Sequence, residues 1–93
     1  MTTNQKERDF VGSPLKEGGA WKSVQALPGI EAKATAALVK AGFVYAHQVV
    51  GKFLIANMDE IVFKEWLSDV MDKSDMQLSA VHLDSCYRGV SRW

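Results

Sequence analysis

The stretch from Leu27 to Phe43 constrains the fold most strongly, because it combines a tight turn with a helix of defined length. Pro28-Gly29 is a strong turn signal. The apolar residues that follow recur at the spacing of one helical face, and they are Ile30, Ala34, Ala37, Leu38 and Ala41. Gly42 is suited to end the helix, since glycine adopts the left-handed conformation at little cost. The pattern predicts a hairpin that leads into a helix.

The residues before the turn complete a helix-hairpin-helix unit. We expect Trp21 to Leu27 to form a short first helix, so that the unit spans residues 21–43. It resembles the helix-hairpin-helix motif, whose core runs Leu-Pro-Gly-Ile-Gly with a lysine two residues after the second glycine. Glu31 replaces that second glycine here, and Lys33 occupies the lysine position.

Such a unit has the features that bind a nucleic-acid backbone. The first N–H groups of a helix lack internal partners and carry the positive end of its dipole. Gly29 lets this helix end approach a phosphate, and Lys33 adds a flexible positive charge. These contacts hold the backbone without reading base sequence. The negative charge of Glu31 opposes these phosphate contacts. The alternative interpretation is an ordinary turn, in which Glu31 is a favourable acid in the first helical turn.

Composition limits the class of protein. The 93 residues suit one domain with a modest core, which oligomerisation would help to stabilise. An apolar content of 47% argues against a disordered chain. No apolar run approaches the ~20 residues of a membrane span and no signal-peptide pattern is seen, so we expect no membrane insertion. Cys86 is the single cysteine, which excludes an internal disulfide and fits a reducing compartment.

The charge balance restricts nucleic-acid binding to a local surface. Eleven basic and eleven acidic residues give a formal net charge of zero. Dedicated nucleic-acid binders are usually basic overall. Any DNA site on this chain must therefore come from a local basic patch.

Helices are predicted on both sides of the hairpin unit. A helix through Phe10 and Val11 should end at residues 12–14, and a loop should follow as far as residue 20. Another helix is expected from residue 44 to 56.

Two more helices are predicted in the C-terminal third. The first begins after Asp59, a good capping residue. The second begins at the capping box Ser74-x-x-Gln77 and frays from Arg88 onward. These patterns together predict a compact all-α domain of five helices over residues 1–93, with no strand.

The helix at residues 44–56 indicates a partner subunit. Its apolar residues cover more than one face, which is typical of a helix buried on several sides. In a small domain, a second subunit is the economical cover for the surplus face. Gly51 lies mid-helix, where glycine costs about 1 kcal/mol relative to alanine, and this suggests the close approach of another backbone. The alternative is a tolerated glycine in an ordinary core helix.

Several of these segments resemble one family. The similar residues are Thr2, Thr3, Gln5, Lys6, Arg8 to Val11 and Pro14, then Gly42, Phe43, Ala46, Gly51, Phe53 and Leu54, then Asp59, Glu60, Phe63 and Glu65 to Leu67. Together they resemble the barrier-to-autointegration factor family over roughly residues 1–71, with a small insertion near Gly18 to Lys22. After Met71 the resemblance fades.

The resemblance implies a function as well as a fold. Proteins of that family are small all-helical homodimers that bind double-stranded DNA without sequence preference, so that one dimer bridges two duplexes. They work in chromatin and nuclear envelope organisation, and the dimer offers a groove to LEM domains of inner nuclear membrane proteins. For this chain the resemblance implies a homodimer, or a heterodimer with a family member, in the nucleus and also in the cytoplasm.

The resemblance also assigns residues by position. The DNA surface would comprise Gln5, Lys6, Gly29, Ile30, Glu31 and, at the start of the last helix, Gln77, to which the general hairpin motif adds Lys33. The dimer interface would comprise Val50, Gly51, Phe53, Leu54 and Trp66. The partner groove would comprise Gly51, Lys52, Ile55, Asn57 and Val62.

Several family contacts to DNA are missing from this chain. Glu31 replaces a glycine, the family's lysine pair falls on Ala36 and Ala37, and an arginine of its last helix falls on Ser79. Each lost phosphate contact removes about 0.9 unit from the logarithmic salt dependence of binding. We therefore expect DNA binding weaker than the family norm. The alternative is a dimeric interaction scaffold that keeps the partner surfaces and has lost much of its DNA affinity.

No set of residues predicts catalysis or a cofactor. His47 and His82 lie far apart and lack the ligand spacing of a zinc site. Cys86 shares a helix face with His82, so a Cys–His nucleophile pair is conceivable, but a buried thiol beside a surface histidine is the favoured interpretation. We expect a binding protein with no catalytic residue, no metal and no cofactor.

Overall fold

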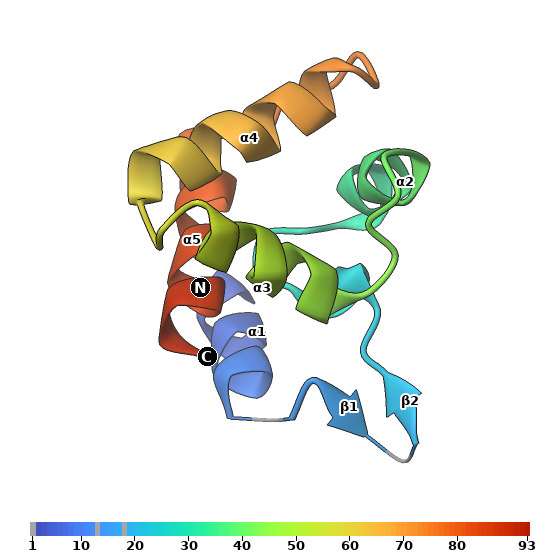
Figure 1. Ribbon diagram of the computed structural model, residues 1–93, viewed down its shortest axis with the longest axis vertical. Helices are drawn as coiled ribbons and strands as arrows, with labels where there is room; N and C mark the ends of the chain where they lie inside the picture. Colours follow the sequence, from blue (N-terminus) through green and yellow to red (C-terminus); the bar gives the residue numbers. More distant parts are fainter. Residues whose placement is uncertain (1, 13, 18) are drawn as a thin grey trace.

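Five α-helices make up most of the residues that the structure describes. The computed structural model describes residues 2–12, 14–17 and 19–93, and the side chains of residues 6–12, 14–16 and 19–93. The helices are α1 (Thr2–Val11), α2 (Ala32–Lys40), α3 (Ala46–Ile55), α4 (Glu60–Asp72) and α5 (Ala80–Arg92) (Figure 1). The predicted all-α class is therefore confirmed. In the described part of the chain, no helix is long and apolar enough to cross a membrane.

A short β-hairpin stands where a loop was expected. Strands β1 (Lys16–Glu17) and β2 (Ala20–Trp21) pair antiparallel, with Lys16 opposite Trp21, and they project from one end of the molecule (Figure 1). Gly19 has a φ of +85°, which a tight connection between two strands favours. The expectation of no strand is contradicted, although two residues in each strand leave the fold class unchanged.

The segment before the turn is not the helix predicted over Trp21 to Leu27. Its helical part is a single 3-10 turn, η1 (Val24–Ala26), in which the Ser23 hydroxyl accepts a backbone N–H at 3.1 Å. A proline disfavours helical backbone in the residue before it. Leu27 precedes Pro28 and is accordingly extended, with a ψ of 136°. Ser23 and Pro28 thus confine the helical conformation to one turn.

Helices α2 and α4 have the ends that the sequence predicts. Helix α2 is followed by Ala41 and then by Gly42 in the left-handed conformation, with a φ of +95°. At the start of α4, the Asp59 carboxylate accepts the backbone N–H of Val62 at 2.9 Å. These two capping predictions are confirmed.

Helix α5 begins later than predicted. Its capping residue is Ser79, whose hydroxyl accepts the N–H of His82 at 3.3 Å. The predicted capping box at residues 74–77 is therefore wrong. The chain instead closes a turn after α4, in which the N–H of Met76 donates to the carbonyl of Met71 at 3.1 Å. This turn uses the residues that the capping box would have placed in the helix.

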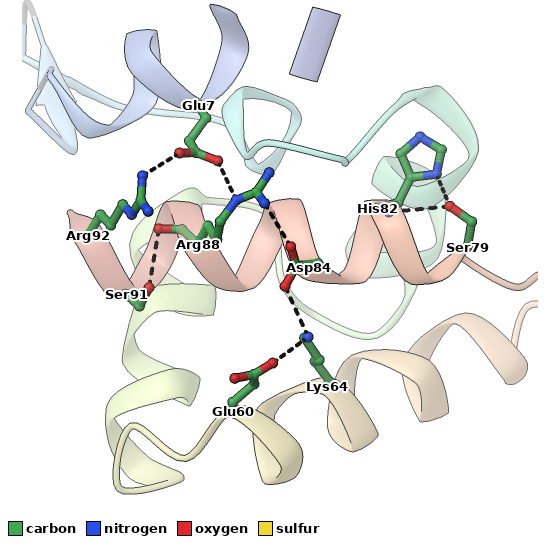
Figure 2. A network of polar contacts seen from close by, with 9 residues as sticks. All are labelled: Glu7, Glu60, Lys64, Ser79, His82, Asp84, Arg88, Ser91 and Arg92. Carbon is green, nitrogen blue, oxygen red and sulfur yellow. Dashed lines mark hydrogen bonds and ion pairs between the residues drawn. The ribbon is translucent and has the colours of Figure 1, made fainter. Parts of the chain in front are cut away.

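A network of ion pairs joins α1, α5 and α4 (Figure 2). Arg88 and Arg92 bond the carboxylate of Glu7 at 2.9 and 3.0 Å, and the Glu7 side chain is only 11% exposed. Asp84 links Arg88 to Lys64 of α4, at 2.8 and 3.3 Å. The predicted fraying from Arg88 is contradicted, because both arginines are anchored and α5 continues to Arg92.

The core is organised around α5, which packs against α1, α3 and α4. Large side chains that are fully buried come from α1, the hairpin turn, α2 and α4, and they include Phe10, Leu27, Ile30, Leu38, Phe63, Leu67 and Met71. Helix α2 packs on α4 and on η1, and the turn at Pro28-Gly29 packs against α5.

Helix α5 approaches the hairpin turn closely because the residues at their contact are small. A Cβ atom on Gly89 would lie 2.7 Å from the ring of Pro28. A Cβ atom on Gly29 would overlap the carbonyl oxygen of His82. Cys86, one turn before Gly89, is fully buried. This packing fixes the turn and therefore the point at which α2 begins.

Candidate nucleic-acid interface

The hairpin turn is a buried support for the start of α2. Pro28 and Ile30 are fully buried, and the N–H of Ile30 donates to the carbonyl of Leu27 at 3.2 Å. Gly29 has a φ of +78°, a conformation that favours glycine, and it is also buried. Of the predicted DNA contacts, Gly29 and Ile30 therefore hold the turn in shape, and their side-chain positions face the protein.

The start of α2 is the exposed part of this unit. Glu31 stands at the capping position but its side chain makes no capping hydrogen bond. The first α-helical bond runs from the N–H of Thr35 to the carbonyl of Glu31 at 2.8 Å. Glu31, Ala32 and Lys33 are all exposed. The backbone N–H groups of this first turn are thus left without a side-chain cap, and Lys33 lies among them.

Lys6 is brought to the hairpin, as the resemblance implied. Its ammonium donates to the carbonyl oxygen of Ile30 at 2.5 Å, which ties α1 to the turn. Burial lowers the pKa of Lys6, while the charge of Glu31 and the thiol of Cys86 act in the opposite direction. A lysine ammonium has three donors, so one is used here and two remain for a ligand.

Cys86 and His82 do not form a nucleophile pair. Nδ1 of His82 lies 2.9 Å from the hydroxyl of Ser79. Cys86 is fully buried, and desolvation raises the pKa of its thiol to about 12, with Lys6 lowering it in part. No group of histidine, cysteine, aspartate and glutamate that could hold a metal occurs among the described residues.

Of the two remaining predicted DNA contacts, the structure describes the side chain of Gln77 only. Gln77 lies in the connection before α5, where it lines a pocket with Asp69 and Asp72 of α4. Two carboxylates beside it make a phosphate contact at Gln77 unfavourable. The side chain of Gln5, on α1, lies outside the described residues.

The predicted dimer residues divide into core and surface. Val50 and Phe53 are buried within the chain, and Trp66 is half-buried, with its ring 4.9 Å from that of Phe43. Leu54, in contrast, is 56% exposed. A Cβ atom on Gly51 would meet no atom of its own chain within 4 Å. The chain itself gives no steric reason for this glycine, so the predicted approach of a partner backbone stays a prediction.

An apolar surface covers the junction of α3 and α4. It includes Leu54, Ile55 and Val62 from the predicted sets, together with Met58 and Ile61, which sequence reasoning missed. Ile55 and Ile61 are the most exposed, at 77% and 70%. We refer to these five residues as the α3–α4 patch. Ile61 could have been found from its position outside the buried stripe of α4.

The two polar members of the predicted groove stand at the edges of this patch. The ammonium of Lys52 lies 5.8 Å from the centre of the Trp66 ring. Asn57 is in the left-handed conformation, with a φ of 59°. Asparagine tolerates that conformation better than most residues. The Lys52 side chain and the backbone of Asn57 thus contribute to the local structure of the α3–α4 junction.

An aromatic cluster lies where the β-hairpin meets α3, and sequence reasoning missed it. The ring of His47 is 4.3 Å from that of Trp21 and 5.8 Å from that of Tyr45. The ammonium of Lys16 lies 5.1 Å from the centre of the Trp21 ring. The pairing of β1 with β2 brings Lys16 to Trp21, and the bridge between Ser23 and Tyr45 brings Trp21 to the start of α3. These contacts are tertiary, so no sequence spacing could have indicated the cluster.

Comparison with known proteins identifies one family that the chain resembles over its length. Residues 1–93 match the family model described as barrier to autointegration factor. The chain is 39% identical to barrier-to-autointegration factor A of Xenopus laevis over 92 residues, which cover 99% of this chain and 92% of the relative. It is 36% identical to barrier-to-autointegration factor of Drosophila melanogaster over 91 residues, covering 98% and 91%.

The match to the human relative is shorter and has a higher identity. The chain is 45% identical to barrier-to-autointegration factor of Homo sapiens over 69 residues, which cover 74% of this chain and 73% of the relative. The longer matches also include the C-terminal helix, where resemblance from motifs alone had faded.

Proposed function

The chain belongs to the barrier-to-autointegration factor family, and we propose that it binds the backbone of double-stranded DNA without reading base sequence. As a dimer it holds two duplexes together and acts in chromatin and nuclear envelope organisation. It works in the nucleus and also in the cytoplasm, as a binding protein and not as an enzyme.

The exposed start of α2 is the observation that carries this proposal. Its first N–H groups have no side-chain cap, and Lys33 lies in the same turn. Lys6 lies against the adjoining carbonyl of Ile30 and has donors to spare. Phosphate oxygens accept hydrogen bonds from uncapped N–H groups and from ammonium groups.

The same surface limits the affinity. The exposed carboxylate of Glu31 lies where a phosphate would approach, and like charges repel. Lys6 must share its ammonium between Ile30 and a phosphate. We therefore propose binding that is weak for one subunit and less steeply dependent on salt than the family norm.

The dimer and its partners form the second part of the proposal. We place the subunit contact on α3 around Gly51, where the chain leaves open space, and on the exposed Leu54. The other exposed residues of the α3–α4 patch then remain for a LEM domain. The second subunit is a further copy of this chain or another family member. Exposed apolar patches of this kind are typical of protein-binding surfaces.

A dimeric interaction scaffold with little DNA affinity is the second candidate. Glu31 favours it, since it adds a negative charge to the hairpin surface. The ion pairs of Arg88 and Arg92 with Glu7 also favour it, because they neutralise basic groups that a DNA surface could use.

Duplex DNA binding at low and at physiological salt separates the two candidates. The measurement is a gel shift on protein whose dimeric state is checked by light scattering. Salt-sensitive complexes that contain more than one duplex are expected. Lys33→Glu should abolish them, whereas Lys16→Glu, on the β-hairpin, should have little effect. A dimer that shifts no DNA at low salt would overturn the DNA proposal and leave the scaffold.

A further inference from the structure

A groove runs along α2, between this helix and the connection from α4 to α5. Lys33 and Lys40 of α2 line it, together with Ser74 and Asp75 of the connection, and its volume is about 360 Å³. An adjoining pocket of about 140 Å³ shares Lys40 and Ser74 and adds Lys73. The shared residues show that the two hollows adjoin, and we refer to them together as the lysine groove.

The lysines of this groove differ from the basic residues whose ion pairs join the helices, which include Lys64, Arg88 and Arg92. Lys33, Lys40 and Lys73 form no ion pair with any residue of the described chain. Lys64 and Arg88, in contrast, are engaged by carboxylates. Three lysines also outnumber the single carboxylate that lines the groove. The groove therefore carries a local positive charge on a chain whose net charge is zero.

The groove begins at the proposed DNA contact. Lys33 lies in the first turn of α2 and Lys40 in the last, seven residues later. At 1.5 Å per residue they are about 10 Å apart along the helix, which corresponds to about three nucleotides of one strand. Between them, Ala36 and Ala37 leave the middle of the groove open. A strand bound at the start of α2 could therefore continue past Lys40.

We propose that the lysine groove binds backbone phosphates of the same duplex DNA and extends the hairpin contact along α2. This inference rests on the proposed function and deepens it. Lys40 and Lys73 then supply charge from the two edges of the groove, beside Ala36 and Ala37, which carry none. The hydroxyl of Ser74 is a further donor for a phosphate oxygen.

Salt dependence of duplex binding tests the charge contribution. Lys40→Ala and Lys73→Ala should each lower the affinity and reduce the logarithmic salt slope by about 0.9 unit. Lys16→Ala, on the β-hairpin outside the groove, is the matched control and should change neither. Circular dichroism verifies that the variants are folded. Unchanged slopes for both groove variants would overturn the inference.

Chemical-shift titration of the unaltered protein with the same duplex separates this inference from the proposed function. Backbone amides at 29–33 report on the hairpin, and those of Lys40 and 73–75 report on the groove. Shifts at both places support both. Shifts at the hairpin alone overturn the groove, and shifts at the groove alone overturn the hairpin contact. Absence of shifts at both sites overturns both proposals. Groove amides that shift with poly-glutamate but not with the duplex overturn the groove proposal alone.

Discussion

At the scale of single residues, the sign of one charge at the start of α2 decides how well the hairpin can hold a phosphate. Glu31 is exposed and forms no capping bond, so its carboxylate contributes little to the helix that it begins. Its charge nevertheless stands among the N–H groups that would receive the phosphate. Lys33, two residues later, carries the opposite charge in the same turn. The negative charge of Glu31 therefore weakens the proposed phosphate contact, and removing this charge should cost the stability of the fold little.

We predict that Glu31→Gly raises DNA affinity. Two unit charges 4 Å apart in water interact by about 1 kcal/mol, so removing one repulsion should strengthen binding about fivefold. Glu31→Gln removes the charge and keeps the side chain, and it should recover most of the gain. Titration of a fluorescent duplex at low salt measures both. Glu65→Gln, on exposed α4, is the control, and equal affinities for all four proteins would contradict the prediction.

Cys86 gives a second prediction at this scale. Burial raises the pKa of its thiol from 9.0 to about 12, so the native protein keeps a proton that the unfolded chain loses above pH 9. Stability should therefore be complete below pH 9 and fall as the pH rises toward 12, by at most about 1.4 kcal/mol per pH unit. Urea unfolding at pH 8 and 10 measures this. Cys86→Ala should lose this part of the alkaline decline, and an identical decline would contradict the assignment.

At the scale of helices, the predictable elements are those whose ends are set by local residues. Gly42 and Asp59 stop and start helices through their own backbone and side chain, so both were predicted correctly. The predicted start of the last helix was wrong because the sequence offers two candidate caps, Ser74 and Ser79. The turn after α4 decides in favour of Ser79. The predicted first helix is reduced to one 3-10 turn, because Trp21 pairs in β2, Ser23 caps the turn and Pro28 restricts the residue before it.

The candidate site divides in the same way. Lys33 and Glu31 could be placed from the sequence, since the hairpin motif fixes their positions. The bond from Lys6 to Ile30 could not, because it depends on how α1 packs beside the turn. The aromatic cluster and the ion pairs of Glu7 likewise join residues that are distant in the sequence. Sequence reasoning thus finds local chemistry and misses what tertiary packing brings to it.

Gly89→Ala tests the packing of α5 on the hairpin. Alanine favours a helix by about 1 kcal/mol over glycine, so an unhindered site would gain stability. Here the added Cβ would lie 2.7 Å from the Pro28 ring. Overpacking costs about 1–3 kcal/mol, so we expect a net loss of up to about 2 kcal/mol in the free energy of unfolding. Urea denaturation measures it, and a variant as stable as the parent would show that the turn can move away.

At the scale of the whole molecule, the proposed weak DNA site gives useful affinity only if the protein binds DNA through more than one such site. Each protomer carries one hairpin, and its net charge of zero gives no general attraction to DNA. Two linked sites raise the local concentration of the second contact and can multiply the affinity many times. The proposed dimer is therefore a condition of useful DNA binding, as well as of bridging.

Gly51→Ala tests this dimer without disturbing the protomer. Within the chain a Cβ at this position meets nothing within 4 Å, so alanine should stabilise the isolated protomer by up to about 1 kcal/mol through its helix propensity. If a partner backbone lies against Gly51, the added methyl group forces the subunits apart and the dissociation constant rises. Sedimentation equilibrium measures that constant, and urea unfolding at high dilution serves as the internal control. A variant that dimerises as tightly as the parent would show that Gly51 does not lie in the subunit interface. A weakened dimer should also lose salt-sensitive duplex bridging in proportion, because each subunit alone retains only its single weak site.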